Sequence, residues 1–203
     1  MREILPGIKH WTVNWPNYFR LESYWINTNT DESVLIDPLE CSGIDEIEES
    51  GKVSGIILTN SSHERQAHLF AQRTGTNIYV PKNHSESLES VTDYISFSDG
   101  DLLPGGLTAI RIETAHRDEY ALLTPVQNGT LIVGDSLGTS DKWVKGGLLV
   151  GGHPVGHPRP WESLSKLLGV DFDNLLPSHG PPLIGQAKQA VVEMINNRHV
   201  PRV

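Results

Sequence analysis

Short runs of hydrophobic residues, separated by turn residues, fill the first half of the chain and predict β-strands. Three such runs lie at residues 11–13, 24–27 and 33–36. A fourth run, 55–59, is almost wholly apolar, which is typical of a strand buried on both faces. Helices are predicted at 42–49 and 63–73, the second ended by Gly75, and another buried strand at 77–80. A strand, a helix and a strand in succession predict a parallel crossover.

The second half of the chain repeats this style. Strands are predicted at residues 95–97, 107–113, 121–124, 130–133 and 174–176. A stretch rich in glycine and proline runs from Lys145 to Pro160, and helices are predicted at 161–168 and 186–197. The two similar halves predict a single domain over residues 1–203 in which each of two sheets carries its helices on its outer side.

Composition and charge narrow the classes of function. The chain has 203 residues, of which 37% are hydrophobic and 20% charged, as in a soluble globular protein. Its formal net charge of −9 disfavours binding to nucleic acid or to an anionic membrane, because both require positive surface. The one cysteine, Cys41, excludes an internal disulfide and a cysteine-based zinc site. The N-terminus has no long apolar run of a secretory signal, so we expect a cytoplasmic protein.

Four segments, taken in order, resemble the metallo-beta-lactamase superfamily. They are Val34–Asp37, Ile57–Arg65, Glu113–His116, and Leu131–Asp135 with Leu176–Pro182 downstream. Each segment alone is a weak signal, but their order and their positions at strand ends make the set specific for the fold. The resemblance spans nearly the whole chain. It implies an α/β fold, namely a four-layer αββα sandwich of two mixed sheets.

The metal-binding loop departs from the pattern of this family. The family segment is similar to Thr-His-x-His-x-Asp-His, whereas Asn60 and Ser62 stand here at the first two histidine positions. Glu64 replaces the aspartate and Arg65 the last histidine. An amide and a hydroxyl are poor zinc ligands, and a guanidinium cannot bind metal. The resemblance therefore implies a degenerate active site with at most one metal ion.

Several family positions are retained. The later family ligands map onto His116, Asp135 and His179, and the strand-end Asp37 supports the metal loop in the family without binding metal. Together with Glu64, the first three predict a mixed site of histidines and carboxylates for one zinc, manganese or iron ion. The alternative is that Arg65 pairs with Asp135 or Glu64 and replaces the metal as the positive centre.

Three further histidines are candidates for the site. His63 lies at a variable position of the loop and could face solvent, bind metal or act as a base. His153 and His157 lie in the Gly/Pro-rich stretch, where they could reach a ligand or belong to a rigid turn. The glycines and prolines around them exclude a regular helical zinc site.

Three functions follow from these residues. The first is a metal-dependent hydrolase of an ester, thioester or amide, with Asp135, Glu64 and His116 as catalytic groups. The second is an inactive relative that binds a protein partner or a small anionic ligand, the latter through Arg65, Asn60 and Ser62. The third is a metal-free hydrolase in which His116 or His63 is the base. A serine triad has no support, because the chain has no Gly-x-Ser-x-Gly motif.

Overall fold

The computed structural model describes residues 1–14, 20–29, 31–82, 88–113, 119–140, 147–150 and 161–197. The first sheet has seven strands, which lie side by side in chain order. They are β1 (Arg2–Leu5), β2 (Ile8–Asn14), β3 (Arg20–Asn27), β4 (Ser33–Ile36), β5 (Val53–Ile57), β6 (Ile78–Pro81) and β7 (Ile95–Phe97). The pairs from β1 to β4 are antiparallel and those from β4 to β7 are parallel. The sheet is therefore mixed, as the sequence predicts.

The second sheet has five strands in the order β14-β11-β10-β9-β8. Their bounds are β8 (Leu102–Leu103), β9 (Leu107–Arg111), β10 (Tyr120–Thr124), β11 (Thr130–Val133) and β14 (Asn174–Pro177). Strands β11 and β14 pair in parallel and the other neighbours antiparallel, so this sheet is also mixed. A separate hairpin of β12 (Leu137–Ser140) and β13 (Gly147–Val150) follows β11.

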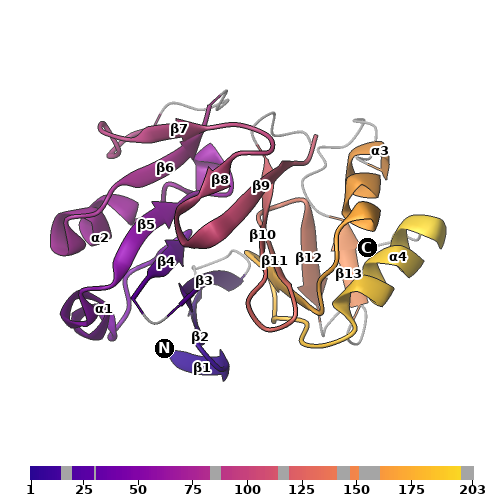
Figure 1. Cartoon of the computed structure of the whole chain (residues 1–203), viewed down its shortest axis with the longest axis horizontal. Coiled ribbons are helices and arrows are strands. Elements are labelled where there is room, and N and C mark those ends of the chain that lie inside the picture. The colour runs from indigo at the N-terminus through magenta and orange to yellow at the C-terminus, as the bar shows by residue number, and fades with distance from the viewer. Residues whose placement is uncertain are drawn as a thin grey trace.

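Helices cover the outer face of each sheet (Figure 1). The short helices are α1 (Ile44–Ser50), α2 (Ala67–Thr74), α3 (Trp161–Leu164) and α4 (Ala187–Asn197), with 3-10 turns η1 (Ser61–His63), η2 (Pro104–Gly106) and η3 (Ser165–Gly169). Helices α1 and α2 lie on one side of the molecule, and α3 and α4 on the other. The result is the four-layer αββα sandwich expected from the sequence.

Three groups of buried hydrophobic residues correspond to the three contacts between the layers. One, around Trp25, Leu35 and Phe70, lies between the first sheet and its helices. Another, around Leu131 and Val191, lies between the second sheet and its helices. The third fills the space between the two sheets.

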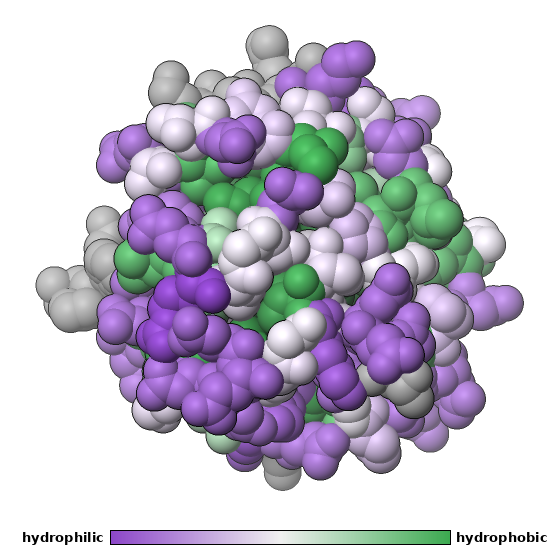
Figure 2. Space-filling view, turned by 60° about the vertical axis from the view of Figure 1, so that its left-hand side comes forward, coloured by the Kyte–Doolittle hydropathy of each residue, from purple (hydrophilic) through white to green (hydrophobic). Residues whose placement is uncertain are grey.

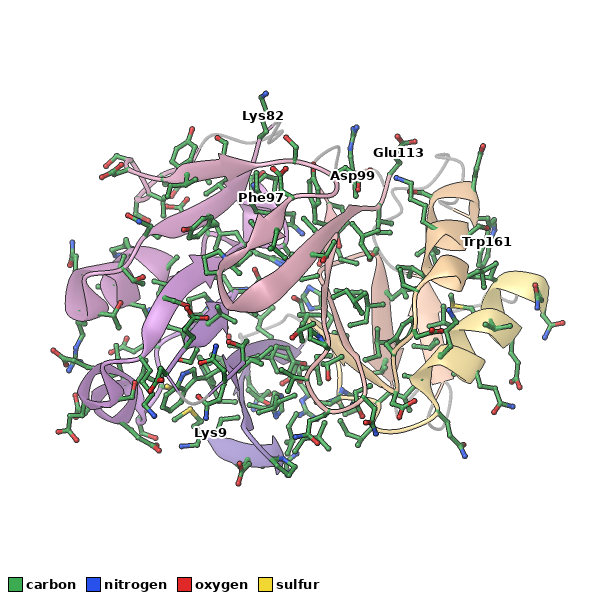
Figure 3. All side chains as sticks on the ribbon, in the orientation of Figure 1. Lys9, Lys82, Phe97, Asp99, Glu113 and Trp161 are labelled. Atoms are coloured by element: carbon green, nitrogen blue, oxygen red, sulfur yellow. The ribbon has the colours of Figure 1, made fainter. Side chains whose placement is uncertain are left out.

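The layer between the sheets is built from alternate residues of the strands, because successive side chains of a strand point to opposite faces. Phe97, labelled in Figure 3, belongs to this layer. Its ring packs edge to face on Tyr120 of the second sheet, with ring centroids 5.0 Å apart. This aromatic contact joins the two sheets.

The surface over α1 and α2 is largely hydrophilic. Figure 2 shows this side with small, separate hydrophobic patches among polar residues. Within the described ranges, no helix is long and apolar enough to cross a membrane.

Two local predictions from the sequence need correction. The helix predicted at 63–73 begins only at Ala67, because Arg65 has a φ of 45° and interrupts the chain between η1 and α2. The Gly/Pro-rich stretch contains a strand at its start, β13, which pairs with β12. Neither β12 nor β13 has the alternating pattern of a half-buried strand, so the sequence did not indicate them.

Candidate functional site

Several strands bring their ends to one place between the sheets. Asp37 follows β4 and Thr59 follows β5, while Asp135 follows β11 and His179 follows β14. The parallel pairs β4 with β5 and β11 with β14 place these ends at matching edges. This is why residues far apart in the sequence meet.

Asp37 is the buried centre of the arrangement. Its Oδ1 accepts a hydrogen bond from the Thr59 backbone N–H at 2.8 Å. Its Oδ2 accepts from the hydroxyls of Thr59 at 2.6 Å and Ser178 at 2.8 Å, and faces Nδ1 of His63 at 3.0 Å. Burial alone would raise the pKa of Asp37, but the His63 charge and these hydrogen bonds lower it. Asp37 thus ties three strand ends together, in line with the supporting role that the resemblance implies.

His63 bridges two carboxylates. While Nδ1 faces Asp37, Nε2 lies 3.2 Å from Oδ1 of Asp135. The side chain is only 7% exposed. Burial alone would lower the pKa of His63, but Asp135 and then Asp37 raise it to about 10. In the absence of metal, the ring is therefore a cation that donates one N–H to each carboxylate.

Asp135 joins His63 to His179. Nε2 of His179 lies 2.8 Å from the same Oδ1, and the two imidazole rings meet edge to face with centroids 5.7 Å apart. Burial alone would raise the pKa of Asp135, but the two histidines hold it well below its usual range. His179 is 29% exposed and Asp135 17%, so this end of the group is open to solvent.

The loop that carries His179 is fixed by backbone contacts. The carbonyl of His179 accepts a hydrogen bond from the N–H of Thr139 in β12 at 3.1 Å. Gly180, with a φ of +91°, lies so close that an added Cβ would stand 1.9 Å from the carbonyl oxygen of Thr139. Only glycine fits there. The hairpin of β12 and β13, which comes after Asp135 in the chain, thus packs against Gly180, the residue next to His179.

Among the residues that the structure describes, the ligand atoms of three come within 4.8 Å of one another: those of His63, Asp135 and His179. Two imidazole nitrogens and a carboxylate oxygen are a donor set that zinc, manganese and iron accept. The residues present therefore fit a single divalent metal ion. Of the predicted ligands, the structure brings together Asp135 and His179, and it adds His63.

Glu64, predicted as a metal ligand and catalytic group, is not part of this group. Its carboxylate accepts hydrogen bonds from the backbone N–H groups of Glu89, Ser90 and Val91 and from the Ser90 hydroxyl. Burial alone would raise the pKa of Glu64, but these hydrogen bonds lower it. The carboxylate is occupied in holding the segment 89–91, which gives it a structural position.

Arg65 does not fork onto Asp135 or Glu64. Its Nη1 donates to the carbonyl of Glu22 at 2.6 Å and to the carbonyl of Asp37 at 2.8 Å. The guanidinium thus links the beginning of β3 to the residue that follows the end of β4. The predicted replacement of the metal by a direct Arg65 ion pair is therefore not what the structure shows.

Asn60 and Ser62 are engaged with one another and with the site. Nδ2 of Asn60 donates to Oε2 of Glu119 at 2.8 Å and lies 3.3 Å from Oδ2 of Asp135. Oδ1 of Asn60 accepts from the Ser62 hydroxyl at 2.6 Å and from the His63 N–H at 3.1 Å. The Asn60 side chain, predicted as a donor to an anion, is thus committed within the protein.

Glu119 is a member of the site that the sequence did not reveal. It precedes β10 and is fully buried. Burial, and then the nearby charge of Asp135, raise the pKa of Glu119 to about 8. The one available signal was a charged residue directly before a buried strand, which is too common to single out.

The remaining predicted residues lie outside the part of the chain that the structure describes. His116 falls within 114–118, and His153 and His157 fall within 151–160. Their predicted roles stay predictions.

The comparisons identify the family of the chain. The sequence profile of the metallo-beta-lactamase superfamily matches residues 10–149, which is more than half of the chain. The chain therefore belongs to the metallo-beta-lactamase superfamily. The search of curated proteins finds no match.

Solved structures of similar fold include a metallo-beta-lactamase family protein from Thermus thermophilus. Its TM-score is 0.67 at 15% identity, with 97% of this chain and 80% of that chain covered. A metallo beta lactamase from Hirschia baltica has a TM-score of 0.66 at 14% identity, with coverage of 100% and 98%. A third protein, solved in a di-iron-bound form, has a TM-score of 0.65 at 16% identity, with coverage of 86% and 94%. At these identities the likeness is one of fold.

Proposed function

We propose that this protein is a hydrolase that works with one metal ion, held by His63, Asp135 and His179. The observation that carries the proposal is the gathering of two imidazole nitrogens and one carboxylate oxygen within 4.8 Å. All three come from segments fixed by neighbouring strands. The membership in the superfamily and the di-iron-bound relative support a metal-dependent chemistry.

The surroundings of His63 suit a metal ligand. Metal-binding histidines in proteins generally donate their other ring N–H to a carboxylate, which fixes the ring and its tautomer. Asp37 stands in that position at 3.0 Å from Nδ1. Nε2 then points toward Asp135 and His179, on the side of the group that is open to solvent.

The expected reaction is hydrolysis of an ester, thioester or amide bond in a small molecule. A bound divalent ion would supply Lewis acidity toward a carbonyl and a nucleophile at neutral pH. The chain would supply the orientation of the three ligands and a partly closed, charged surrounding. His116 stays the candidate for a further ligand or a base, and we expect no nucleic-acid or membrane partner because of the net charge of −9.

A metal-free binding protein is the second candidate. It is favoured by the direct contacts at 3.2 and 2.8 Å, which satisfy the charges of His63 and Asp135 without an ion. Against an anion-binding role stands the engagement of Asn60 and Arg65 inside the protein. We therefore place the metal-dependent hydrolase first.

Metal content tests this choice. The wild-type protein, purified without chelator or nickel, is analysed by mass spectrometry beside His63→Ala and His179→Ala. His68→Ala serves as the matched control, because His68 lies on α2 outside the ligand group. We expect about one equivalent of zinc, manganese or iron in wild type and control and a loss in both site variants. No metal in the wild type, even after incubation with each ion, would contradict the proposal.

Activity is the second readout. The metal-loaded wild type and the same variants are assayed with ester, thioester and amide substrates. We expect hydrolysis of at least one class, lost with the metal in both site variants. A rate that is unchanged in His179→Ala would contradict a role of this site in the reaction.

A further inference from the structure

A buried glutamate stands directly behind Asp135. Glu119 is fully buried, and its Oε1 accepts a hydrogen bond from the backbone N–H of Ser136 at 3.1 Å. Its Oε2 accepts from Nδ2 of Asn60 at 2.8 Å. The Glu119 carboxyl group thus binds the backbone of Ser136, next to Asp135. It also binds the Asn60 side chain, which in turn contacts Asp135.

Asn60 transmits this constraint to the carboxylate of Asp135. The nitrogen that contacts Glu119 also lies 3.3 Å from Oδ2 of Asp135. The amide cannot turn over, because its Oδ1 accepts from the Ser62 hydroxyl and the His63 N–H. A turned amide would set its NH₂ group against the His63 N–H and its oxygen against the carboxyl oxygens of Glu119 and Asp135. Asn60 therefore holds Oδ2, and Oδ1 is the oxygen that faces His63 and His179.

The absence of a side chain at Gly134 leaves room for the Glu119 carboxyl group. A Cβ on Gly134 would lie 2.7 Å from Oε1 of Glu119 and 2.6 Å from Oγ1 of Thr59. The missing side chain at residue 134 is what allows the Glu119 carboxyl group to lie against the backbone that precedes Asp135. Glu119 consequently contacts the chain on both sides of this aspartate.

We propose that Glu119 is a positioning residue that, through Asn60 and Ser136, presents Oδ1 of Asp135 to His63 and His179. Groups behind a metal ligand commonly fix its orientation, and their loss weakens metal binding about 10–100-fold. The inference rests on the proposed function where it concerns metal. The orientation of Asp135 itself is a property of the metal-free protein.

The test compares Glu119→Gln with Thr130→Val. In Glu119→Gln, an NH₂ group must face either the Ser136 N–H or the Asn60 amide, and both are donors. Thr130→Val removes a buried hydroxyl that donates to the Val126 carbonyl in the same sheet, away from the site. Two quantities are measured: the affinity for Zn²⁺, and the NMR signals of the His63 ring N–H groups in metal-free protein.

We expect Glu119→Gln to weaken Zn²⁺ binding about 10–100-fold and to shift or broaden the His63 ring signals. Thr130→Val should leave both unchanged. A Glu119→Gln variant with the wild-type affinity and the wild-type ring signals would overturn the proposal. If the wild type binds no Zn²⁺, the proposed function fails, and the ring signals of metal-free protein still decide the role of Glu119.

A second variant covers the case that Glu119→Gln does not fold. Asn60→Ala cuts the connection between Glu119 and Asp135 and should change the His63 ring signals in the same way. Where both single variants fold, the double variant should weaken Zn²⁺ binding by less than the two single losses together, since the two residues share one contact. Wild-type ring signals in Asn60→Ala, or additive losses in the double variant, would contradict the inference.

Discussion

His63 shows how the surroundings of one residue determine its chemistry. In the sequence it lies at a variable position of a loop whose usual ligands are replaced, so it was one candidate among several. In the structure Asp37 faces one ring nitrogen and Asp135 the other. The spacing along the chain cannot reveal this, because it depends on the direction of the side chain within a 3-10 turn.

The raised pKa of His63 predicts that metal uptake releases a proton. The ring carries its second proton up to a pH of about 10, and a metal ligand must lose it. Below that pH, the affinity for Zn²⁺ should rise about tenfold for each unit of pH, with about one proton released per ion. Calorimetry in buffers of different ionisation enthalpy measures the number of protons. Release of none at pH 7 would exclude His63 as a ligand.

Glu64 gives a second prediction at this scale, because sequence and structure assign it different roles. Glu64→Gln should lower the free energy of unfolding by about 2 kcal/mol, since an amide nitrogen would meet the N–H donors of residues 89–91. Its metal content should equal that of the wild type.

Chemical denaturation and metal analysis check both points. The control is Glu49→Gln, which changes an exposed glutamate on α1. A Glu64→Gln protein that is as stable as the wild type but binds no metal would instead support Glu64 as a metal ligand, as the sequence predicts.

At the scale of elements, several strands predicted from the sequence have the bounds that the structure shows. The predictions at 33–36, 95–97 and 130–133 coincide with β4, β7 and β11. The start of α2 was wrong because the conformation of Arg65 is set by the carbonyls it reaches in other strands. A local pattern contains no information about such distant partners.

The hairpin of β12 and β13 also escaped the sequence, yet it fixes the loop of His179. Gly180→Ala would place a Cβ against the Thr139 carbonyl and should cost at least about 3 kcal/mol of stability. Because the loop must move, metal binding should weaken as well.

Gly185→Ala is the matched control, since Gly185 also has a positive φ but no atom within 4 Å of an added Cβ. It should cost only about 1–2 kcal/mol, without an effect on metal binding. Thermal unfolding and Zn²⁺ titration measure the two effects. Equal costs for the two variants would contradict the close approach at Gly180.

At the scale of the whole molecule, the order of the four segments that resemble the superfamily was enough to predict the sandwich. In this fold the ends of the strands that carry these segments meet at one edge. Asp37, Asp135 and His179 were found this way. Glu119 was not, since nothing in its own neighbourhood of the sequence distinguishes a buried glutamate from a surface one. The site therefore combines positions fixed by the fold with partners specific to this chain.

The buried charges predict how stability depends on pH in metal-free protein. The pKa of Glu119 is raised from 4.5 to about 8 and that of His63 from 6.5 to about 10. The folded state therefore binds more protons than the unfolded state across this range, and stability falls as pH rises from about 5 to 10. The lowered pKa values of Asp37 and Asp135 have the opposite effect below a pH of about 4.

Urea denaturation across this range of pH should thus show a maximum of stability near a pH of about 5. In His63→Gln, the decline between pH 7 and 10 should be smaller than in the wild type, because one of the two groups is gone. A stability that is constant from pH 5 to 10 would contradict the electrostatics of the site.

The most direct test of a single metal site is to locate the ion. Crystals grown with Zn²⁺, measured above and below the zinc absorption edge, give an anomalous difference map. The account predicts one peak in the site, within bonding distance of Nε2 of His63, Oδ1 of Asp135 and Nε2 of His179. Two peaks, a peak at Glu64, or a site without any peak in crystals that hold zinc elsewhere would contradict it.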